Sequence, residues 1–450
     1  MNSARRGLRV LLACHRYPPD GIGGIERMVE SLGQDLPALG DQVTIFAGRP
    51  LTGDPLQPAL VRESLGQGGR LFRLSAPARG PHQPFGPARL EELFTAALIE
   101  SGPDVAHFFQ LLNLSPGILE IAARQRVPII ISLQDFYFVC PRTHLQKADG
   151  QSCAGPNAGQ ECAQTCFASQ GAAALQLWGL RALYFRRLLD LADAIVCPSR
   201  YVADYFIRRQ GLPPGQVRVI PNGILPLPRP ARAPFTPRQR GCLRLAYLGA
   251  VAPHKGVHQL LEAVAQAALP AVQLELNGTT HDYPEYVAGL RQRGARIAGL
   301  DLRINGPYEP ERLPQLLQSA DCVVVPSLVP ETFALVSREA LAQGVPILVA
   351  RSGGLPEAID PGVNGLAFAP DQPAELADHL RALWEDEALL VRLRRGAAQS
   401  VVMFTPAHAQ EMHRLYADVL EASARRPEGK PALLAELAML HKLMRQIGFG

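Results

Sequence analysis

The chain has 450 residues, with 45 Lys and Arg against 41 Asp and Glu, and a formal net charge of +4. Hydrophobic residues make up 47% of it and aromatic residues only 6%, which fits a globular protein of two or three domains. The even charge balance and the lack of a basic, aromatic-rich stripe exclude nucleic acid as an expected partner.

Targeting signals are weak. No apolar run approaches the roughly 18 residues needed to span a bilayer. The apolar run near the N-terminus, residues 10–14, is too short for the core of a signal peptide. We therefore expect a cytoplasmic protein whose first strand is buried.

The first half of the chain alternates strands and helices. A helix is predicted between the first two strands, because residues 25–36 place their apolar side chains on one helical stripe that ends near Pro37. Alternation of this kind predicts a parallel sheet covered on both faces. The predicted strands are 9–14, 42–47, 105–109, 128–133, 194–198 and a short one at 218–220.

A second alternating region follows a proline-rich stretch, residues 221–240, which we interpret as a semi-extended linker. Strands are predicted at 243–248, 272–277, 322–325 and 346–350, and helices at 256–268, 309–319 and 334–342. The prediction is an α/β protein with two doubly wound, Rossmann-like domains facing a cleft, residues 1–220 and 241–404, with C-terminal helices at 405–450. Ligands bind such sheets at the carboxyl ends of the strands.

Two amphipathic stretches allow two interpretations each. Residues 430–450 place leucines on one face with Lys and Arg beside them, which favours packing on the body of the protein over contact with an anionic membrane. Residues 175–208 combine aromatic residues with arginines. They are either a covering helix with snorkelling arginines or a docking surface for an anionic membrane that holds a lipid-linked acceptor.

Chemistry is indicated most strongly by residues 330–357. Glu331 is predicted to lie in the loop before a helix, and Glu339 about two turns along that helix. The backbone N–H groups of Phe333, Ala334 and Leu335 lie at the helix N-terminus, which favours phosphate. Carboxylates beside an anion site point to a ligand with both hydroxyls and phosphates, such as a sugar nucleotide.

Two glycine-bearing turns each join a strand to a helix. Gly23 and Gly24 follow the first strand and would let the backbone approach a ligand closely; a plain turn is the alternative. Lys255 opens a helix after the strand at 243–248, where its ammonium could meet a diphosphate. A solvated lysine is the alternative there, and the flanking glycines favour the functional interpretation.

Together these motifs resemble the retaining glycosyltransferases of family four, also called glycosyl transferase group 1, which have the GT-B fold. The resemblance runs from residue 9 to about residue 404. Its strongest part is the spacing of Glu331 and Glu339, the family's Glu-x7-Glu motif. The flanking segments that support it are residues 325–327, 344–346, 353–357 and 362–366.

The resemblance implies a nucleotide-sugar donor, held mainly by the second domain, and a glycan or lipid-linked glycan acceptor. Glu331 would contact the hydroxyls of the transferred sugar, Glu339 the ribose hydroxyls, and Lys255 the diphosphate. The acceptor would lie near His107 and Asp135. The remaining donor-binding residues would be Gly23, Gly24, Thr332, Phe333, Ala334 and Leu335.

The implied mechanism is transfer with retention at the anomeric carbon, in which the leaving phosphate takes the acceptor's proton. It requires no metal or other cofactor for catalysis, because electrostatic stabilisation of the diphosphate carries most of the rate. Three positions depart from the family pattern: Ala250 stands where arginine is frequent, Gln134 where histidine is frequent, and Ala334 where glycine is usual. Another GT-B nucleotide-sugar enzyme, such as an epimerase, and a non-catalytic sugar-nucleotide-binding protein remain alternatives.

The cysteines form a separate pattern. Four of the eight, Cys140, Cys153, Cys162 and Cys166, lie in one polar, insertion-like segment, residues 140–166. Four thiolates could hold a structural zinc ion or an iron–sulfur cluster. The spacing lacks the paired Cys-x2-Cys of a zinc ribbon, so reduced, free thiols are an equal alternative. The segment is similar to Cys-Pro-Arg stretches in some bacterial members that build surface polysaccharides. For this chain, peripheral association with the inner face of the membrane is the alternative to a purely cytoplasmic location.

Overall fold

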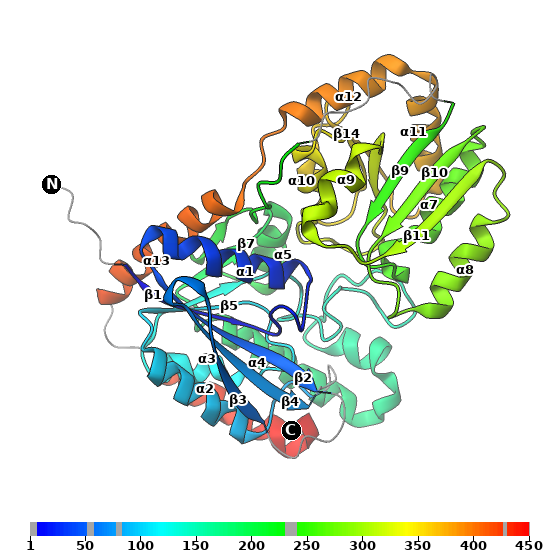
Figure 1. The fold of residues 1–450 in the computed structure, drawn as a ribbon. Helices are drawn as coiled ribbons and strands as arrows, with labels where there is room; N and C mark the ends of the chain where they lie inside the picture. The colour runs from blue at the N-terminus through cyan, green and yellow to red at the C-terminus, as the bar shows by residue number, and fades with distance from the viewer. Residues whose placement is uncertain (1–6, 52–57, 78–82, 230–240, 426–429, 450) are drawn as a thin grey trace. The chain divides into compact units, whose positions relative to one another are not determined.

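The computed structural model describes residues 7–51, 58–77, 83–229, 241–425 and 430–449, and the chain divides into two compact units (Figure 1). Unit 1 comprises Met1–Gly223 and Thr405–Gly450, and unit 2 comprises Ile224–Phe404. Two doubly wound α/β domains are therefore confirmed. The C-terminal helices, predicted as a separate segment, belong to unit 1. Residues 230–240 of the predicted linker lie outside the described residues.

Unit 1 is built on an eight-stranded sheet with the order β3-β4-β2-β1-β5-β6-β7-β8. Neighbouring strands are parallel except β3 and β4, which are antiparallel. The strands are β1 (Arg9–Cys14), β2 (Gln42–Leu51), β3 (Ala59–Ser64), β4 (Arg70–Pro77), β5 (Val105–Phe108), β6 (Ile129–Ser132), β7 (Ala194–Cys197) and β8 (Val217–Val219). The helices are α1 (Gly24–Asp35), α2 (Ala88–Ser101), α3 (Gly117–Arg124), α4 (Ala174–Leu189), α5 (Arg200–Gln210), α13 (Thr405–Ala424) and α14 (Pro431–Met444).

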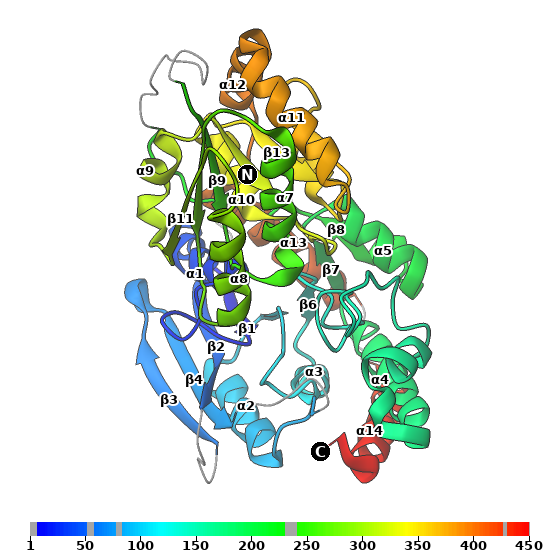
Figure 2. The same cartoon turned by 90° about the vertical axis from the view of Figure 1, so that its right-hand side faces the viewer.

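Alternate residues of the central strands belong to two hydrophobic cores, one on each face of this sheet. In β1, Leu11 and Ala13 join the core under α2, α3, α4 and α14, whereas Val10 and Leu12 join the core under α1 and α13. Figure 2 shows these helices on the two sides of the sheet. A strand buried on both faces reads as a continuous apolar run, which is why β1 was predictable.

Unit 2 has a six-stranded parallel sheet with the order β11-β10-β9-β12-β13-β14. Its strands are β9 (Leu243–Leu248), β10 (Val272–Asn277), β11 (Leu300–Gly306), β12 (Cys322–Val325), β13 (Ile347–Ala350) and β14 (Gly365–Phe368). Its helices are α7 (Val257–Ala267), α8 (Pro284–Gly294), α9 (Leu313–Gln318), α10 (Leu335–Ala342), α11 (Pro373–Glu385) and α12 (Glu387–Gln399). Buried hydrophobic residues from the strands and helices of this unit form one core.

Several elements were not predicted. Among them β4, α2 and α3 do carry buried apolar residues, whereas the others lack a clear apolar pattern. Both β3 and β11 lie at sheet edges and contain no fully buried residue. β14 has only four residues. The missing helix α8 has few buried side chains. Edge strands are free to carry polar residues, because only one side of them is paired.

The amphipathic stretches pack on the body of unit 1. In α14, Leu437, Leu440 and Met444 are buried in the core shared with α4, as the favoured interpretation expected. In α4, Trp178 and Phe185 are buried in the same core. This helix is therefore a covering helix, and its aromatic residues do not form an outward-facing membrane surface.

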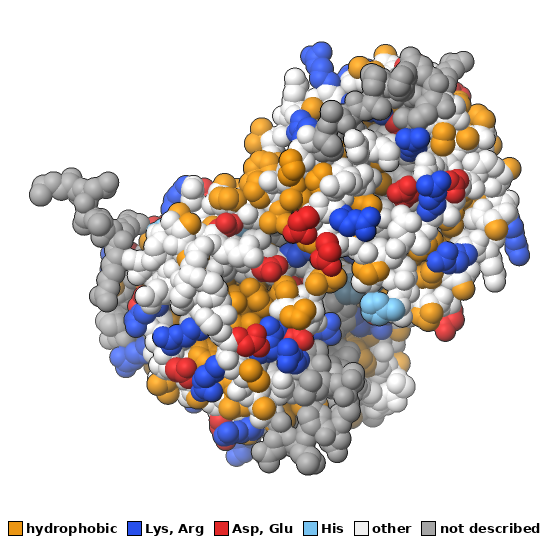
Figure 3. Space-filling view, viewed as in Figure 1, with side chains coloured by type: hydrophobic (Ala, Val, Ile, Leu, Met, Phe, Trp, Pro, Cys, Tyr) orange, Lys and Arg blue, Asp and Glu red, His pale blue; other side chains and the backbone are white. Residues whose placement is uncertain are grey.

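The surface carries mixed charge. On the face shown in Figure 3, Lys and Arg side chains are interspersed with Asp and Glu side chains. This distribution matches the nearly even composition of the chain. No helix among the described residues combines the length and apolar character that crossing a bilayer requires.

Candidate functional site

The order of the strands locates the site in unit 2. From β9 the sheet grows outward through β10 and β11 on one side, and through β12, β13 and β14 on the other. The order in which strands are added to the sheet therefore reverses between β9 and β12, which are parallel neighbours. In doubly wound sheets the crevice at this switch point, beyond the carboxyl ends of the strands, is where ligands bind.

Lys255 and Glu331 come from the two loops that flank this switch point. Lys255 follows β9 in a short 3-10 turn, and Glu331 follows β12. The ammonium of Lys255 donates to a carboxylate oxygen of Glu331 over 2.7 Å. The hydroxyl of Ser327 donates to the same oxygen over 2.5 Å. Two residues that were assigned separate roles thus form one charged pair.

The carboxylate of Glu331 is ionised in this setting. Burial would raise the pKa of Glu331, but the Lys255 ammonium and the Ser327 hydroxyl outweigh burial and hold the pKa below its ordinary value. A buried, ionised carboxylate with a bound cation can accept hydrogen bonds from hydroxyl groups. It is poorly suited to act as a general acid, because it does not carry a proton near neutral pH.

Gly256 brings the two loops together. Its φ is +72°, and a Cβ there would lie 2.0 Å from the carbonyl oxygen of Pro326 in the loop after β12. Only glycine allows this contact between backbones. The glycine that follows Lys255 therefore sets the distance between Lys255 and the Glu331 loop.

The backbone of Glu331 is held by the Gly353–Gly354 turn after β13. The amide of Gly354 donates to the carbonyl oxygen of Glu331 over 2.6 Å, and Glu331 forms an isolated β-bridge with Gly353. Gly353 has φ +65°, and a Cβ there would lie 2.2 Å from the same carbonyl oxygen. The sequence marked these glycines as part of the motif, but did not reveal that they fix Glu331.

Helix α10 begins one residue later than predicted, at Leu335. Its N-cap residue, Ala334, adopts the left-handed conformation with φ 56° and ψ 82°. This conformation is comfortable for glycine and costs an alanine about 1–2 kcal/mol. The departure from the family pattern at position 334 is therefore a strained backbone position at the start of the helix. The first amides of a helix have no carbonyl partner four residues earlier; in α10 the amide of Ser337 donates to the carbonyl oxygen of Ala334 over 3.1 Å.

The rest of the motif splits between interior and surface. Phe333 is buried, and the guanidinium of Arg338 lies 4.0 Å from the centre of its ring and also donates to its carbonyl oxygen. Burial lowers the pKa of Arg338 to about 10. Thr332 and Glu339 are partly exposed. Phe333 thus supplies a backbone amide to the helix start, while its side chain belongs to the core.

Unit 1 has a switch point of its own, between β1 and β5. His15 follows β1, and its imidazole lies 3.2 Å from the carboxylate of Glu26 in the first turn of α1. Burial would raise the pKa of Glu26, but the hydrogen bond to His15 keeps the pKa below its ordinary value. Neither residue was singled out in the sequence, because no motif marks them.

Asp135 lies at the same edge of the sheet, after β6. Its carboxylate accepts hydrogen bonds from the side-chain amide of Gln110 and from the amide of Tyr137. Burial raises the pKa of Asp135 to about 6, against these two hydrogen bonds and the nearby His15. The neighbouring Gln134 instead pairs with the side chain of Asn222.

His107 lies inside the unit rather than at the edge. Its side chain is buried, and its ring nitrogens contact the Tyr416 hydroxyl at 2.9 Å and the Ser132 hydroxyl at 2.8 Å. Burial lowers the pKa of His107 to about 3, so the ring is neutral. Its contacts tie α13 to the sheet, and this buried placement does not support contact with an acceptor.

The glycine turn after β1 is occupied by protein. A Cβ at Gly23 would lie 2.8 Å from a carboxylate oxygen of Glu26, and one at Gly21 would lie 2.5 Å from the other. Gly23 is the N-cap residue of α1, and Gly24 is the first residue of that helix. A side chain at Gly21 or Gly23 would therefore require the Glu26 carboxylate to move.

Comparisons with known proteins agree with this architecture. Residues 22–226 match the family model "Glycosyltransferase Family 4", and residues 237–400 match "Glycosyl transferases group 1". The glycogen synthase of Mycobacterium tuberculosis is 28% identical over 413 residues, 87% of this chain and 90% of the relative. A D-inositol 3-phosphate glycosyltransferase of Corynebacterium diphtheriae is 30% identical over 257 residues, 53% of this chain and 59% of the relative.

Solved structures show the same fold. Sucrose-phosphate synthase from Thermosynechococcus elongatus aligns with a TM-score of 0.68 at 22% identity, covering 93% of this chain and 100% of that one. WaaG, described as a glycosyltransferase involved in lipopolysaccharide biosynthesis, aligns with a TM-score of 0.57 at 16% identity, with coverage of 93% and 100%. At these identities the likeness concerns the fold alone.

Proposed function

Because the chain belongs to the family 4, group 1 glycosyltransferases of GT-B fold, we propose that it moves a sugar from a nucleotide-sugar donor to a hydroxyl of a glycan or lipid-linked glycan, with retention at the anomeric carbon. The observation that carries the proposal is the Lys255–Glu331 pair at the switch point of unit 2. It places a cation and an ionised carboxylate where a doubly wound sheet binds ligands.

The donor is bound by groups of opposite character. Lys255 and the amides at the start of α10, from Phe333 to Leu335, offer positive charge and N–H donors to the diphosphate. The carboxylates of Glu331 and Glu339 accept hydrogen bonds from sugar and ribose hydroxyls, respectively. Thr332 lies between Glu331 and Phe333 in the sequence and is proposed to contact the donor as well. On binding, Lys255 exchanges part of its contact with Glu331 for the phosphate oxygens.

Retention follows if the leaving phosphate accepts the proton of the acceptor hydroxyl on the face that it vacates. The charge that develops on the diphosphate in this step needs fixed cations and N–H dipoles. Lys255 and the first turn of α10 are positioned to provide them. The low pKa of Glu331 supports a role in holding the sugar rather than in proton transfer. The chemistry as proposed uses no metal ion.

The acceptor side is proposed at the β1–β5 edge of unit 1. Asp135, whose pKa of about 6 lies close to neutral, is the residue there best suited to accept a hydrogen bond from an acceptor hydroxyl. The His15–Glu26 pair lies at the same edge. A surface polysaccharide or glycolipid acceptor is the finer proposal, supported by the resemblance of the cysteine segment to such enzymes.

A cytoplasmic location is part of the proposal, since no disulfide joins any of the eight cysteines, all of which are among the described residues, and disulfides are rare in that compartment. Peripheral membrane association is tested by flotation of the full chain with anionic vesicles at low salt. Binding that high salt abolishes would favour a lipid-linked acceptor, and no binding would favour a free glycan.

A donor panel tests the proposed function. Wild type and Glu331→Gln are compared for thermal shift and for sugar release from each nucleotide sugar, with Glu285→Gln as the control. Glu285 is exposed and lies in α8 of the same unit. A ligand at about 100 times its dissociation constant should add about 2.7 kcal/mol of stability.

We expect one donor to stabilise wild type and the control and to be turned over by both, and Glu331→Gln to lose turnover. Equal turnover by all three proteins would refute the role of Glu331, and donor binding without any turnover would favour a binding protein.

A further inference from the structure

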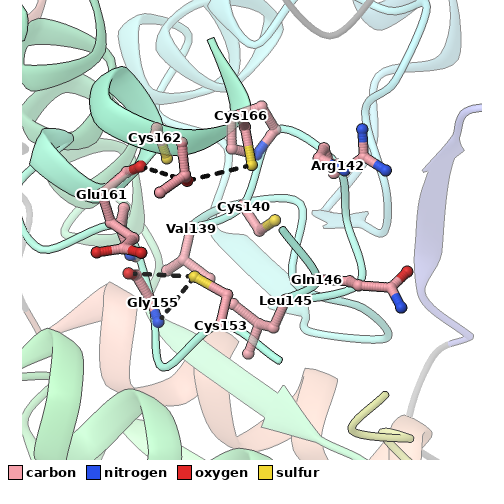
Figure 4. A pocket seen from close by; sticks show the side chains of 13 residues that line it. Val139, Cys140, Arg142, Leu145, Gln146, Cys153, Gly155, Glu161, Cys162 and Cys166 are labelled. Carbon is pink, nitrogen blue, oxygen red and sulfur yellow. Dashed lines mark hydrogen bonds between the residues drawn. The ribbon is translucent and has the colours of Figure 1, made fainter. Parts of the chain in front are cut away.

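The cysteine segment of unit 1 forms a pocket that the glycosyl-transfer chemistry does not use. Cys140, Cys153, Cys162 and Cys166 all line this one pocket. Figure 4 shows Cys162 and Cys166 on a helical turn at the top, with Cys140 and Cys153 on loops below them. The four cysteines, spread over 27 residues of sequence, therefore converge in space, and all four are free thiols.

The pocket is small. The centre of a water-sized sphere can occupy only about 10 Å³ of it, about the space that one ordered water molecule takes. A single ion therefore fits with the least rearrangement of the walls.

The backbone around two of the cysteines favours thiolates. The amide of Gly155 donates to the sulfur of Cys153 over 3.4 Å, and the Cys153 thiol donates to the carbonyl oxygen of Gly155 over 3.4 Å. The backbone groups of Arg142 and Leu145 favour the thiolate form of Cys140. In both cases one of these backbone groups lies two residues after the cysteine. Hydrogen bonds of this kind stabilise the charged form of a ligand and orient it. Burial nevertheless raises the pKa of both thiols, so without a further positive charge they stay protonated.

A helical turn presents the other two cysteines. Cys162 and Cys166 span the π-helical turn that precedes α4, and residues four apart lie on the same side of a helical turn. Cys140 and Cys153 line the same pocket as this turn, so the four sulfurs border one space.

Arg181 supplies an independent observation. Its side chain, in α4, is 2% exposed, and no carboxylate among the described residues forms an ion pair with it. Its Nη2 donates to the carbonyl oxygen of Tyr137 over 2.9 Å, its guanidinium covers the ring of Phe185, and its Nε has no partner. Cys140 and Cys162 lie close enough that thiolates there would offset the charge of the guanidinium. A buried guanidinium without a counter-charge is costly, and negative sulfurs would compensate it.

We propose that Cys140, Cys153, Cys162 and Cys166 bind one structural Zn²⁺ ion as a four-thiolate site. Binding releases the four thiol protons and leaves a site with a net charge of −2, which the neighbouring Arg181 partly neutralises. Four sulfur ligands in a tetrahedron are the preferred environment of structural zinc. In the described residues no three His, Cys, Asp or Glu side chains already meet the geometry of a bound metal, so binding turns the thiols inward by side-chain rotation.

The ion would stabilise the wall of unit 1 next to Asp135. The segment begins five residues after Asp135. A Cβ at Gly159 would meet the backbone of Trp178 at 2.2 Å, so the segment also lies directly on α4. It contains few apolar side chains, and a metal ion stabilises such polar segments by coupling its binding free energy to folding.

Metal content of the full chain tests the proposal. The protein is produced with excess zinc, dialysed without chelator and analysed for zinc, with Cys153→Ser and Cys166→Ser as the test variants. Cys242→Ser is the matched control, because Cys242 is also half-buried but lies in unit 2. We expect about one zinc per chain in wild type and in the control, and less than about one tenth in either test variant.

A second measurement keeps the test independent of variant folding. Titration of wild type with a mercurial should release its zinc after about four thiols have reacted. Removal of zinc by a strong chelator should lower the melting temperature, and zinc should restore it. Cobalt loaded in place of zinc should show the absorption of a tetrahedral thiolate site. Wild type that carries no more zinc than Cys153→Ser, zinc that survives both cysteine substitutions, or an iron–sulfur spectrum would overturn the proposal.

Discussion

The Nζ atom of Lys255 and the Oε1 atom of Glu331 lie 2.7 Å apart although 76 residues separate them in the chain. They meet because β9 and β12 are neighbours at the switch point of their sheet, and each residue lies in the loop that follows its strand. Gly256 then brings the two loops into contact, and Gly353, in the turn after β13, holds the backbone of Glu331 in place. The pair is thus a product of topology and of two close backbone approaches.

Replacement of Lys255 by methionine should lower sugar transfer by about 10²–10³-fold, since one fixed charge at a developing anion contributes that much. It also leaves Glu331 partly buried without its cation, which should reduce the free energy of unfolding by about 1–3 kcal/mol. Initial rates and urea denaturation measure the two effects. The double variant with Glu331→Gln should regain stability but not activity. Unchanged activity of Lys255→Met would exclude Lys255 from catalysis.

The sequence was most informative where the signal is local. The strand β12, the helix α10 and the two carboxylates of the Glu-x7-Glu motif all lie within residues 322–342. Their pattern can therefore be recognised in the sequence without knowledge of the fold. The contact of Gly353 with Glu331 and the pairing of Lys255 with Glu331 depend on which strands are neighbours. That information is not contained in any short segment of the chain.

Long-range packing explains the main errors as well. The family resemblance placed the acceptor near His107, but α13, about 300 residues later, belongs to unit 1, and its Tyr416 contacts the buried ring of His107. His15 and Glu26 were overlooked because each is unremarkable alone and only their 3.2 Å contact makes them a pair. The polar edge strand β3 gave no apolar pattern to detect.

Replacement of Ala334 by glycine should stabilise the protein by about 1 kcal/mol, because the left-handed backbone at this position strains any residue with a Cβ. Chemical denaturation measures the difference. Ala340→Gly is the matched control: Ala340 lies within the same helix, where glycine should cost about 1 kcal/mol. Equal effects of the two substitutions would mean that Ala334 is not strained. Donor affinity should be retained in Ala334→Gly, since the amides of the helix start are unchanged.

Replacement of Gly353 by alanine should displace the backbone of Glu331, because the added Cβ would lie 2.2 Å from its carbonyl oxygen. We expect sugar transfer to fall at least about 100-fold, as small displacements of a positioned group can have this effect. Gly362→Ala is the control for conformational cost alone. Gly362 also has positive φ, 77°, but a Cβ there meets nothing within 4 Å. Kinetics of the two variants separate the clash from the backbone preference, and similar losses in both would contradict the positioning role of Gly353.

Replacement of Asp135 by asparagine should make stability less dependent on pH. The pKa of Asp135 is about 6 in the folded chain, above its ordinary value of 3.8, so the folded state binds more protons than the unfolded state between these values. The contribution of this group is therefore fully present below about pH 4 and is lost as the pH rises through about 6. The asparagine variant avoids that loss, because it carries no charge that burial disfavours.

We expect Asp135→Asn to gain about 1–3 kcal/mol over wild type as the pH rises from about 4 to about 7. Denaturation curves over this range measure the gain, and Asp204→Asn in α5, whose side chain is 60% exposed, is the control. A difference that stays constant with pH would show that Asp135 titrates normally. If sugar transfer by the wild type also rises with an apparent pKa near 6, and this inflection disappears in Asp135→Asn but not in Asp204→Asn, the titration belongs to the acceptor side of the reaction. The charged form of Asp135 would then be the one that binds the acceptor hydroxyl, at the expense of the stability that the protonated form provides.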